Sequence, residues 1–130
     1  MTATYLLDTC TFLWLALDQK QVPKSVIGKL SSAEAYLYLS IASVWEIGLK
    51  DGKGIRLTRP LDDFIGTALE SYRIQLMPIQ VTACAQLKKL PLIHRDPFDR
   101  MLIAQSIVSG CELVTPDKKI ARYAVRASWE

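Results

Sequence analysis

Short apolar runs alternate with stretches of helical periodicity along most of the chain. Residues 4–7 (TYLL), 36–41 (YLYLSI) and 111–115 (CELVT) are apolar runs of strand length. Residues 74–79 (IQLMPI) predict a weaker strand, because Pro78 cannot donate a hydrogen bond to a neighbouring strand. The pattern therefore predicts strands spread over the whole chain rather than gathered in one part of it.

Segments with helical spacing of apolar residues lie between these runs. Ser43 and Thr82 are placed where an N-cap is expected, Pro97 suits a first helical position, and Gly110 suits a C-terminal cap. A basic segment after Asp117 predicts a last helix. The predicted helices cover residues 12–16, 43–49, 60–72, 82–90, 97–109 and this final basic segment.

Strands separated by helices predict an α/β fold in which a central, mostly parallel sheet is covered by helices on both faces. The chain has 130 residues and no break in composition, so we expect a single domain over residues 1–130. In sheets of this kind, functional sites form at the carboxyl ends of the strands. Acidic residues at those ends are therefore the first candidates for a site.

Four acidic residues occupy such positions. Asp8 ends the first predicted strand and Asp117 follows the last, while Asp99 and Glu46 are expected in the first turns of helices. Carboxylates about 4 Å apart repel by roughly 4 kcal/mol at an effective dielectric constant near 20. A divalent cation with a preference for oxygen, Mg²⁺ or Mn²⁺, would neutralise them, and would do so with few carboxylates and a substrate phosphate. The four acids together therefore predict a metal site, although each taken alone is more often structural.

The stretch HRDPFDR, residues 94–100, holds two aspartates three positions apart. Asp96 precedes Pro97 and is explained as an N-cap. Asp99 is explained less well by capping, because the reciprocal cap prefers Glu or Gln at that position. Its role is more easily understood at a metal site.

The net charge of +3 is too small to indicate a polyanionic partner by itself, but the distribution of basic residues is informative. They cluster near the candidate acids, where they could contact phosphates or simply form a solvated surface. These basic residues are Lys50, Lys53, Arg56, Arg95, Arg100, Lys118, Lys119 and Arg122.

The remaining composition narrows the class of protein. The cysteines Cys10, Cys84 and Cys111 are odd in number and widely spaced, so we expect small core residues and neither disulfides nor a zinc site. Trp14 and Trp45 are also expected in the core, with an interface as the alternative. No apolar run is long enough to span a bilayer and no signal peptide is visible, so we expect a soluble cytoplasmic protein.

Four segments carry a family resemblance over almost the whole chain: YLLDTCTFLWL, SIASVWEIGLK, LPLIHRDPFDRMLIAQ and LVTPDKKIARY, in that order. They resemble the PIN-domain ribonucleases, and the nearest likeness is to the VapC-type toxins of prokaryotic toxin–antitoxin pairs. The resemblance implies a three-layer PIN-like sandwich and a Mg²⁺- or Mn²⁺-dependent endoribonuclease. It also implies a homodimer that is neutralised by a cognate VapB-type antitoxin.

The resemblance also assigns roles to residues. Asp8, Glu46 and Asp99 match the three main acids of the family, Asp117 matches the fourth, and Thr115 matches a hydroxyl residue near the metal. The candidate RNA contacts are Arg95, Arg100, Lys118, Lys119 and His94, and His94 is also weighed as an acid catalyst. Two positions depart from the family: Cys10 stands where close relatives often have His, and Pro116 where a polar or basic residue is usual.

A metal ion held this way would help a water molecule attack phosphorus in line with the departing 3′-oxygen, leaving 5′-phosphate and 3′-hydroxyl ends. Three alternatives compete with this reading. A receiver-type signalling module would need an acid after a middle strand, where the chain has Gln80. A phosphatase with an Asp-x-Asp pair would need an acid at Cys10. A PIN relative that only binds RNA or protein would be expected to lack some of the four acids.

Overall fold

The sheet of this chain is wholly parallel. The computed structural model describes residues 2–129, and within them the strands pair in the order β3-β2-β1-β4-β5. The register pairs Leu6 of β1 with Tyr38 of β2 on one side and with Leu113 of β4 on the other. The strands are β1 (Ala3–Leu7), β2 (Ala35–Ser40), β3 (Ile74–Met77), β4 (Glu112–Val114) and β5 (Ala127–Ser128).

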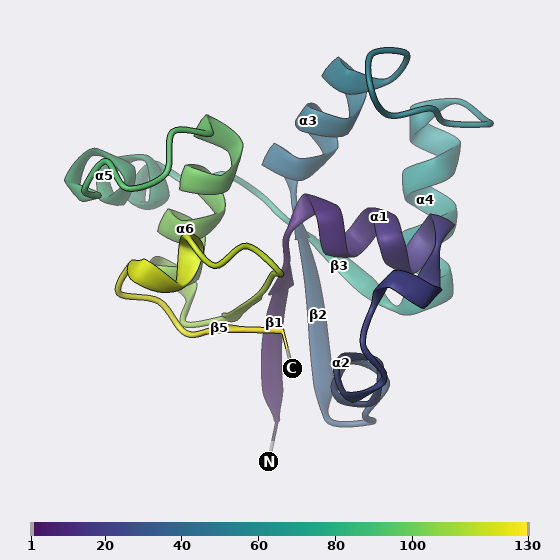
Figure 1. The fold of residues 1–130 in the computed structure, drawn as a ribbon, viewed down its shortest axis with the longest axis horizontal. Helices are drawn as coiled ribbons and strands as arrows, with labels where there is room; N and C mark the ends of the chain where they lie inside the picture. Colours follow the sequence, from purple (N-terminus) through teal and green to yellow (C-terminus); the bar gives the residue numbers. More distant parts are fainter. Residues whose placement is uncertain (1, 130) are drawn as a thin grey trace.

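Helices cover both faces of the sheet, so the three-layer α/β architecture predicted from the sequence is confirmed. In Figure 1, α1, α2 and α4 lie on one side of β1 and β2, whereas α5 and α6 lie on the other. The helices are α1 (Thr9–Leu17), α2 (Lys24–Leu30), α3 (Ile41–Lys50), α4 (Leu61–Tyr72), α5 (Val81–Lys89) and α6 (Pro97–Ser109). Two 3₁₀ turns, η1 (Gln19–Gln21) and η2 (Ile120–Arg122), complete the set within the described residues.

Consecutive strand residues supply the two sides of the core. Leu6 belongs to the apolar cluster beneath α6, and Leu7 belongs to the cluster beneath α1, α2 and α4; both side chains are fully buried. Successive side chains of a strand point to opposite faces, and a parallel sheet buries both. This is why the β1 sequence is a continuous apolar run rather than an alternating one.

The order of the strands reverses at β1. The chain runs from β1 outward to β2 and β3, then returns through α5 and α6 to β4, on the opposite side of β1. In open parallel sheets, ligands bind in the crevice at such a switch point, outside the carboxyl ends of the strands. The residues that directly follow β1 and β4 therefore lie at the most favourable place for a site.

Several predicted boundaries were wrong. The helix expected to begin at Ser43 is capped by Ser40, whose side chain accepts from the backbone N–H of Ala42, so Ile41 belongs to α3 and not to β2. The helix α5 begins at Val81 without a side-chain cap, so Thr82 is not its N-cap. The sequence could not decide the start of α3, because Ser40 and Ser43 are equally suitable caps, and the N-cap of α5 is Gln80, which makes no side-chain capping bond.

The elements at both ends of the chain were also predicted incompletely. The helix α2 was not predicted, and the expected final basic helix is only the turn η2, followed by the short edge strand β5. Ala127 pairs with Leu113 and Ser128 with Val114. A strand of two residues has no readable pattern of its own and forms because β4 offers it an unpaired edge.

The predictions for cysteine and tryptophan need correction too. Cys111 is buried as expected, but Cys10 is only partly buried and Cys84 is exposed. Trp14 packs against the core, whereas Trp45 is 60% exposed on α3. Between residues 2 and 129, no helix combines the length and the apolar character needed to cross a membrane.

Candidate active site

An open hollow of about 530 Å³ lies at the carboxyl ends of the strands, beside the switch point. All four predicted acids line it, together with Asp96. The lining residues are Asp8, Thr9, Cys10, Leu13, Glu46, Lys50, Gly54, Ile55, Asp96, Asp99, Pro116 and Asp117. The structure thus brings together side chains that come from four separate regions of the chain.

Asp8 is the most deeply buried of these acids, with 4% of its surface exposed. It caps α1 by accepting from the backbone N–H of Thr11 at 2.7 Å, and its second oxygen accepts from the Thr115 hydroxyl at 2.6 Å. Burial raises the pKa of Asp8, and the hydrogen bonds from Thr11 and Thr115 oppose this without reversing it. Thr115, which the resemblance places near the metal, therefore takes part in the site by donating a hydrogen bond to Asp8.

Glu46 is the sixth residue of α3 and not part of its first turn, which corrects the predicted position. One carboxylate oxygen accepts from the Thr9 hydroxyl at 2.6 Å, and the other pairs with the Lys50 ammonium at 2.5 Å. Although it belongs to a helix, Glu46 is only 6% exposed. Sequence reasoning missed Thr9, and only the spacing of four between Glu46 and Lys50 could have indicated their pairing.

Asp96 and Asp99 lie at the start of α6, as predicted. Asp96 is the N-cap and accepts from the backbone N–H groups of Phe98 and Asp99 at 2.8 and 3.1 Å. The pKa of Asp99 is raised to about 7, chiefly by burial and then by the negative charges of Asp96 and Asp8, while His94 opposes the shift. The charge of Asp99 is therefore sensitive to the other charges in the hollow.

His94 links Asp117 to Asp99. Its Nε2 lies 2.7 Å from an Asp117 oxygen and 3.2 Å from an Asp99 oxygen, and its Nδ1 accepts the backbone N–H of Asp96 at 3.1 Å. Because Nδ1 is an acceptor, a neutral His94 carries its single proton on Nε2 and donates it to Asp117, the nearer carboxylate. Burial acts to raise the pKa of Asp117, but hydrogen bonds from His94 and the Lys119 backbone outweigh it and lower that pKa.

The donors fit a hard divalent cation. The side chains facing the hollow offer carboxylate oxygens, the ligands that Mg²⁺ and Mn²⁺ prefer. Atoms of His94, Asp99 and Asp117 all lie within 4.8 Å of one another, a spacing that one ion could span. In the observed ring orientation, however, His94 presents a proton rather than a lone pair, so the carboxylates are the donors that fit the ion.

Side chains of the protein itself already offset part of the repulsion among the acids. Asp8 accepts from Thr115, Glu46 from Lys50 and Asp117 from His94, whose Nε2 also lies 3.2 Å from Asp99. Donors of this kind reduce the repulsion between carboxylates.

The two departures from the family pattern, Cys10 and Pro116, both line the hollow. The pKa of the Cys10 thiol is raised to about 11 by burial and then by the charges of Asp8, Asp99 and Glu46. In the metal-free protein the thiol therefore stays protonated near neutral pH, and a protonated thiol is not a nucleophile.

The basic residues predicted to contact RNA differ in how far they are free to do so. Arg95, Lys118 and Lys119 are exposed. The Arg100 guanidinium instead donates to the carbonyl of Pro91 at 3.0 Å and to the Tyr123 hydroxyl at 3.3 Å. Tyr123 in turn accepts from the backbone N–H of His94 at 2.7 Å. Arg100 thus holds the loop before α6, and its contact with RNA stays an untested prediction.

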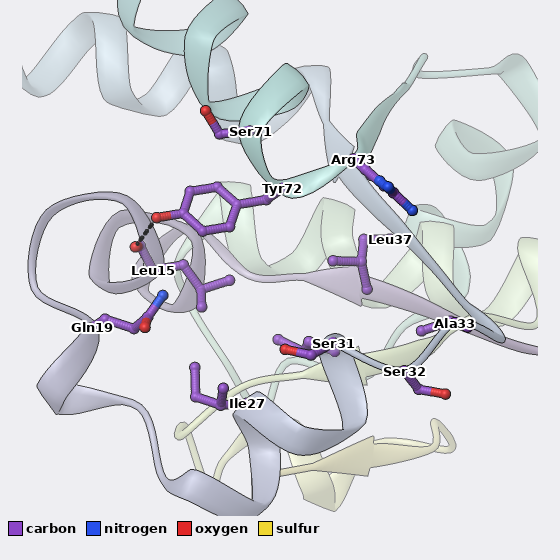
Figure 2. A pocket seen from close by; sticks show the side chains of 12 residues that line it. Leu15, Gln19, Ile27, Ser31, Ser32, Ala33, Leu37, Ser71, Tyr72 and Arg73 are labelled. Atoms are coloured by element: carbon purple, nitrogen blue, oxygen red, sulfur yellow. Dashed lines mark hydrogen bonds between the residues drawn. The ribbon is translucent and has the colours of Figure 1, made fainter.

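A second hollow of about 500 Å³ lies among α2, the start of β2 and the end of α4 (Figure 2). It is lined by apolar side chains such as Leu15, Ile27 and Leu37 and by serine hydroxyls, with Arg73 at one side and no acidic residue. Its Tyr72 hydroxyl is already used by the carbonyl of Leu15. The acidic hollow, which gathers the titratable side chains, is therefore the candidate active site.

Comparison with known proteins places this architecture in a family. The family model of the PIN domain matches residues 5–126, whereas a search of curated proteins found no match. The chain is similar to VapBC2 from Rickettsia felis bound to a DNA fragment from its promoter, with a TM-score of 0.78, 14% identity, and coverage of 98% of this chain and 99% of that chain.

Two further crystal structures share the fold. DNA-bound VapBC from Salmonella typhimurium has a TM-score of 0.69 and 14% identity, covering 98% of both chains. VapBC-1 from nontypeable Haemophilus influenzae has a TM-score of 0.67 and 16% identity, covering 96% of both chains. At these identities the likeness concerns the fold, and the match of the family model over residues 5–126 shows that the chain belongs to the PIN domain family.

Proposed function

We propose that this protein is a divalent-metal-dependent endoribonuclease, the VapC-type toxin of a toxin–antitoxin pair. One observation carries the proposal: Asp8, Glu46, Asp99 and Asp117, from four regions of the chain, line a single hollow at the switch point of a PIN-domain sheet. Their convergence is difficult to explain by capping, because Glu46 caps no helix and is nevertheless buried.

The four carboxylates hold Mg²⁺ or Mn²⁺, and neighbouring side chains orient them. Thr115 fixes one oxygen of Asp8, Thr9 fixes one oxygen of Glu46, and Asp96 sets the start of the helix that presents Asp99. When bound, the ion supplies the positive charge that activates a water molecule and stabilises the charge developing on the scissile phosphate. Hydrolysis by water leaves 5′-phosphate and 3′-hydroxyl ends.

The substrate binds by its backbone at the rim of the hollow. Arg95, Lys118 and Lys119 are exposed beside Asp96 and Asp117 and bind phosphates, while the acidic centre holds the metal. The Nε2 atom of His94 lies between the carboxylates of Asp117 and Asp99 and holds them close together. We infer that the protein acts on RNA in the cytoplasm.

Cleavage of labelled RNA tests the activity directly. Purified protein with Mn²⁺ is expected to cleave, EDTA to abolish cleavage, and Asp99→Asn to reduce the rate at least about 100-fold, since it removes a metal ligand. Cleavage that persists in EDTA would contradict the metal mechanism. A well-folded wild type that binds RNA without cutting it would favour the alternative of a binding-only PIN relative.

The antitoxin is proposed from the fold. The three structures named above are VapBC complexes, and two of them also contain DNA. We expect expression of this chain alone to arrest growth, and co-expression of a small neighbouring reading frame to relieve the arrest. Persistence of the arrest in the presence of every adjacent reading frame would contradict the pairing.

A homodimer is proposed from an exposed apolar surface. Ile41, Trp45 and Leu49 recur every four residues on α3 and are 40, 60 and 53% exposed. Trp45 also contacts Phe98 of α6, with ring centroids 5.1 Å apart. Exposed patches of this kind mark interfaces.

Trp45→Gln is therefore expected to shift the mass measured by light scattering from dimer toward monomer. Val81→Gln, on the exposed surface of α5, serves as the control and should leave the mass unchanged. A wild type that is monomeric at micromolar concentration would contradict the dimer.

A further inference from the structure

Lys50 is the one cation among the described residues that line the acidic hollow, alongside five acids, Asp8, Glu46, Asp96, Asp99 and Asp117. Its ammonium lies 2.5 Å from Glu46 Oε2. This is not an ordinary surface pair, because the Glu46 side chain is only 8% exposed while that of Lys50 is 46% exposed. One partner is therefore fixed in the site and the other can reach solvent.

The backbone of Lys50 is anchored independently of its side chain. Its carbonyl accepts from the backbone N–H groups of Lys53 at 2.8 Å and Ile55 at 3.2 Å, which closes the turn after α3. Gly52, with φ of +85°, permits this turn. The ammonium can therefore leave Glu46 by rotation about side-chain bonds, without any change in the helix or the turn.

Glu46 is also prepared for an exchange of partners. Its Oε1 stays bound to the Thr9 hydroxyl at 2.6 Å, so the departure of Lys50 frees only Oε2. A carboxylate held at one oxygen presents the other in a fixed direction, which is what a monodentate ligand of a divalent cation requires.

We propose that Lys50 is an exchangeable counter-ion of Glu46: a divalent cation and the Lys50 ammonium compete for Glu46 Oε2, and the displaced ammonium binds a phosphate of the RNA at the rim of the hollow. This inference rests on the proposed function, because it requires both the metal and the RNA. It goes beyond that function by assigning two successive partners to one lysine and by coupling metal binding to substrate binding.

Mn²⁺ affinity measured by titration calorimetry tests the competition. In protein stripped with EDTA and dialysed, Lys50→Met should bind Mn²⁺ about fivefold more tightly than wild type, because the cation no longer displaces an ion pair. Lys50→Arg keeps the pair and should bind Mn²⁺ no more tightly than wild type. Lys53→Met, which removes an exposed lysine of the adjacent turn, controls for the change in net charge.

Equal gains in Lys50→Met and Lys53→Met would overturn the competition, since a general charge effect would then explain both. A wild type that binds no Mn²⁺ would overturn the proposed function together with this inference. Lys50→Gln repeats the test if Lys50→Met does not fold.

Affinity for a short fluorescent single-stranded RNA of mixed sequence tests the second partner. The logarithm of the binding constant is measured by anisotropy against the logarithm of salt concentration, within a period in which a gel shows the RNA intact. Loss of one phosphate contact on a single strand changes this slope by about 0.7. Lys50→Met should reduce the slope by about that amount with Mn²⁺ and leave it unchanged in EDTA.

Slopes reduced equally with and without Mn²⁺ would overturn the exchange, because Lys50 would then contact RNA irrespective of the metal. Slopes unchanged in both conditions would exclude Lys50 from the RNA interface. Either result would leave the proposed nuclease activity standing, provided that wild type binds Mn²⁺ and cleaves RNA.

Discussion

The Thr115 hydroxyl donates to Asp8, a residue 107 positions earlier in the chain. Glu46 is likewise held by Thr9, which is distant in sequence, and by Lys50 on the next helical turn. Charge-assisted hydrogen bonds of 2.5–2.7 Å are short and strong. At the residue scale, the site therefore depends as much on small hydroxyl residues as on the acids.

Thr115→Val keeps the shape of the side chain and removes its hydroxyl. The free energy of unfolding at pH 7 should fall by about 1–3 kcal/mol, because Asp8 keeps its burial and loses a donor. Urea denaturation measures this, with the exposed Thr82→Val as the control. The effect should shrink in an Asp8→Asn background. An equal loss there would show that Thr115 acts through packing or through the backbone N–H of Asp117, which its hydroxyl also accepts, and not through Asp8.

Asp99 should make stability depend on pH. Its pKa is 3.8 in an ordinary setting and about 7 here, so between those values the folded protein binds more protons than the unfolded chain and stability falls as pH rises. Asp99→Asn removes this dependence. At one pKa unit per 1.36 kcal/mol, the mutant gains at most about 4 kcal/mol relative to wild type by pH 8.

Denaturation in EDTA from pH 4 to 8 checks this prediction. Asp63→Asn, an exposed first-turn aspartate of α4, is the charge-matched control and should follow the wild-type profile. Parallel profiles for wild type and Asp99→Asn would mean that the protonation of Asp99 is not coupled to folding.

At the scale of elements, the ends of α6 decide where Asp99 lies. Asp96 begins this helix and Gly110 ends it, with φ of +79° and a backbone N–H that donates to the Ser106 carbonyl. Both features were predicted from the sequence, because Asp-Pro before an apolar helical pattern and Gly after it are strong local signals. The helical position of Glu46 was predicted incorrectly because Ser43, and not Ser40, was taken as the N-cap of α3.

Two glycine substitutions separate backbone strain from helix propensity. Gly110→Ala should reduce stability by about 1 kcal/mol, since alanine is disfavoured in the left-handed region. Gly66→Ala, within α4 and with no neighbouring atom within 4 Å of the added carbon, should increase stability by about 0.5–1 kcal/mol. Changes of the same sign in thermal denaturation would contradict this assignment of the two positions.

At the scale of the whole molecule, the reversal of strand order gathers the acids. Asp8 follows β1 and Asp117 follows β4, and these strands are neighbours although a hundred residues separate them in the chain. The helices α3 and α6, which present Glu46 and Asp99, pack on each other at the same end of the sheet. The site is therefore a property of the topology and not of any one segment.

Binding of a metal should stabilise the folded molecule. Mn²⁺ at about 100 times its dissociation constant contributes about 2.7 kcal/mol. For a chain of this length, that corresponds to a rise in Tm of roughly 10 °C. Calorimetric scans with Mn²⁺, with NaCl of equal ionic strength and with Asp99→Asn check this: the rise should be absent with NaCl and smaller in the mutant.

The sequence by itself determined the α/β class, the strands β1, β2 and β4, and the two caps of α6, since apolar periodicity and capping residues act over a few neighbouring positions. It also indicated which acids end those elements. Only the tertiary structure decided that Lys50 and Thr9 share Glu46, that His94 joins Asp117 to Asp99, that Trp45 is exposed and that β5 is a strand. These features depend on contacts between segments that are far apart in the sequence. Those contacts are set by the order of the strands in the sheet, and the local pattern of apolar and polar residues does not determine that order.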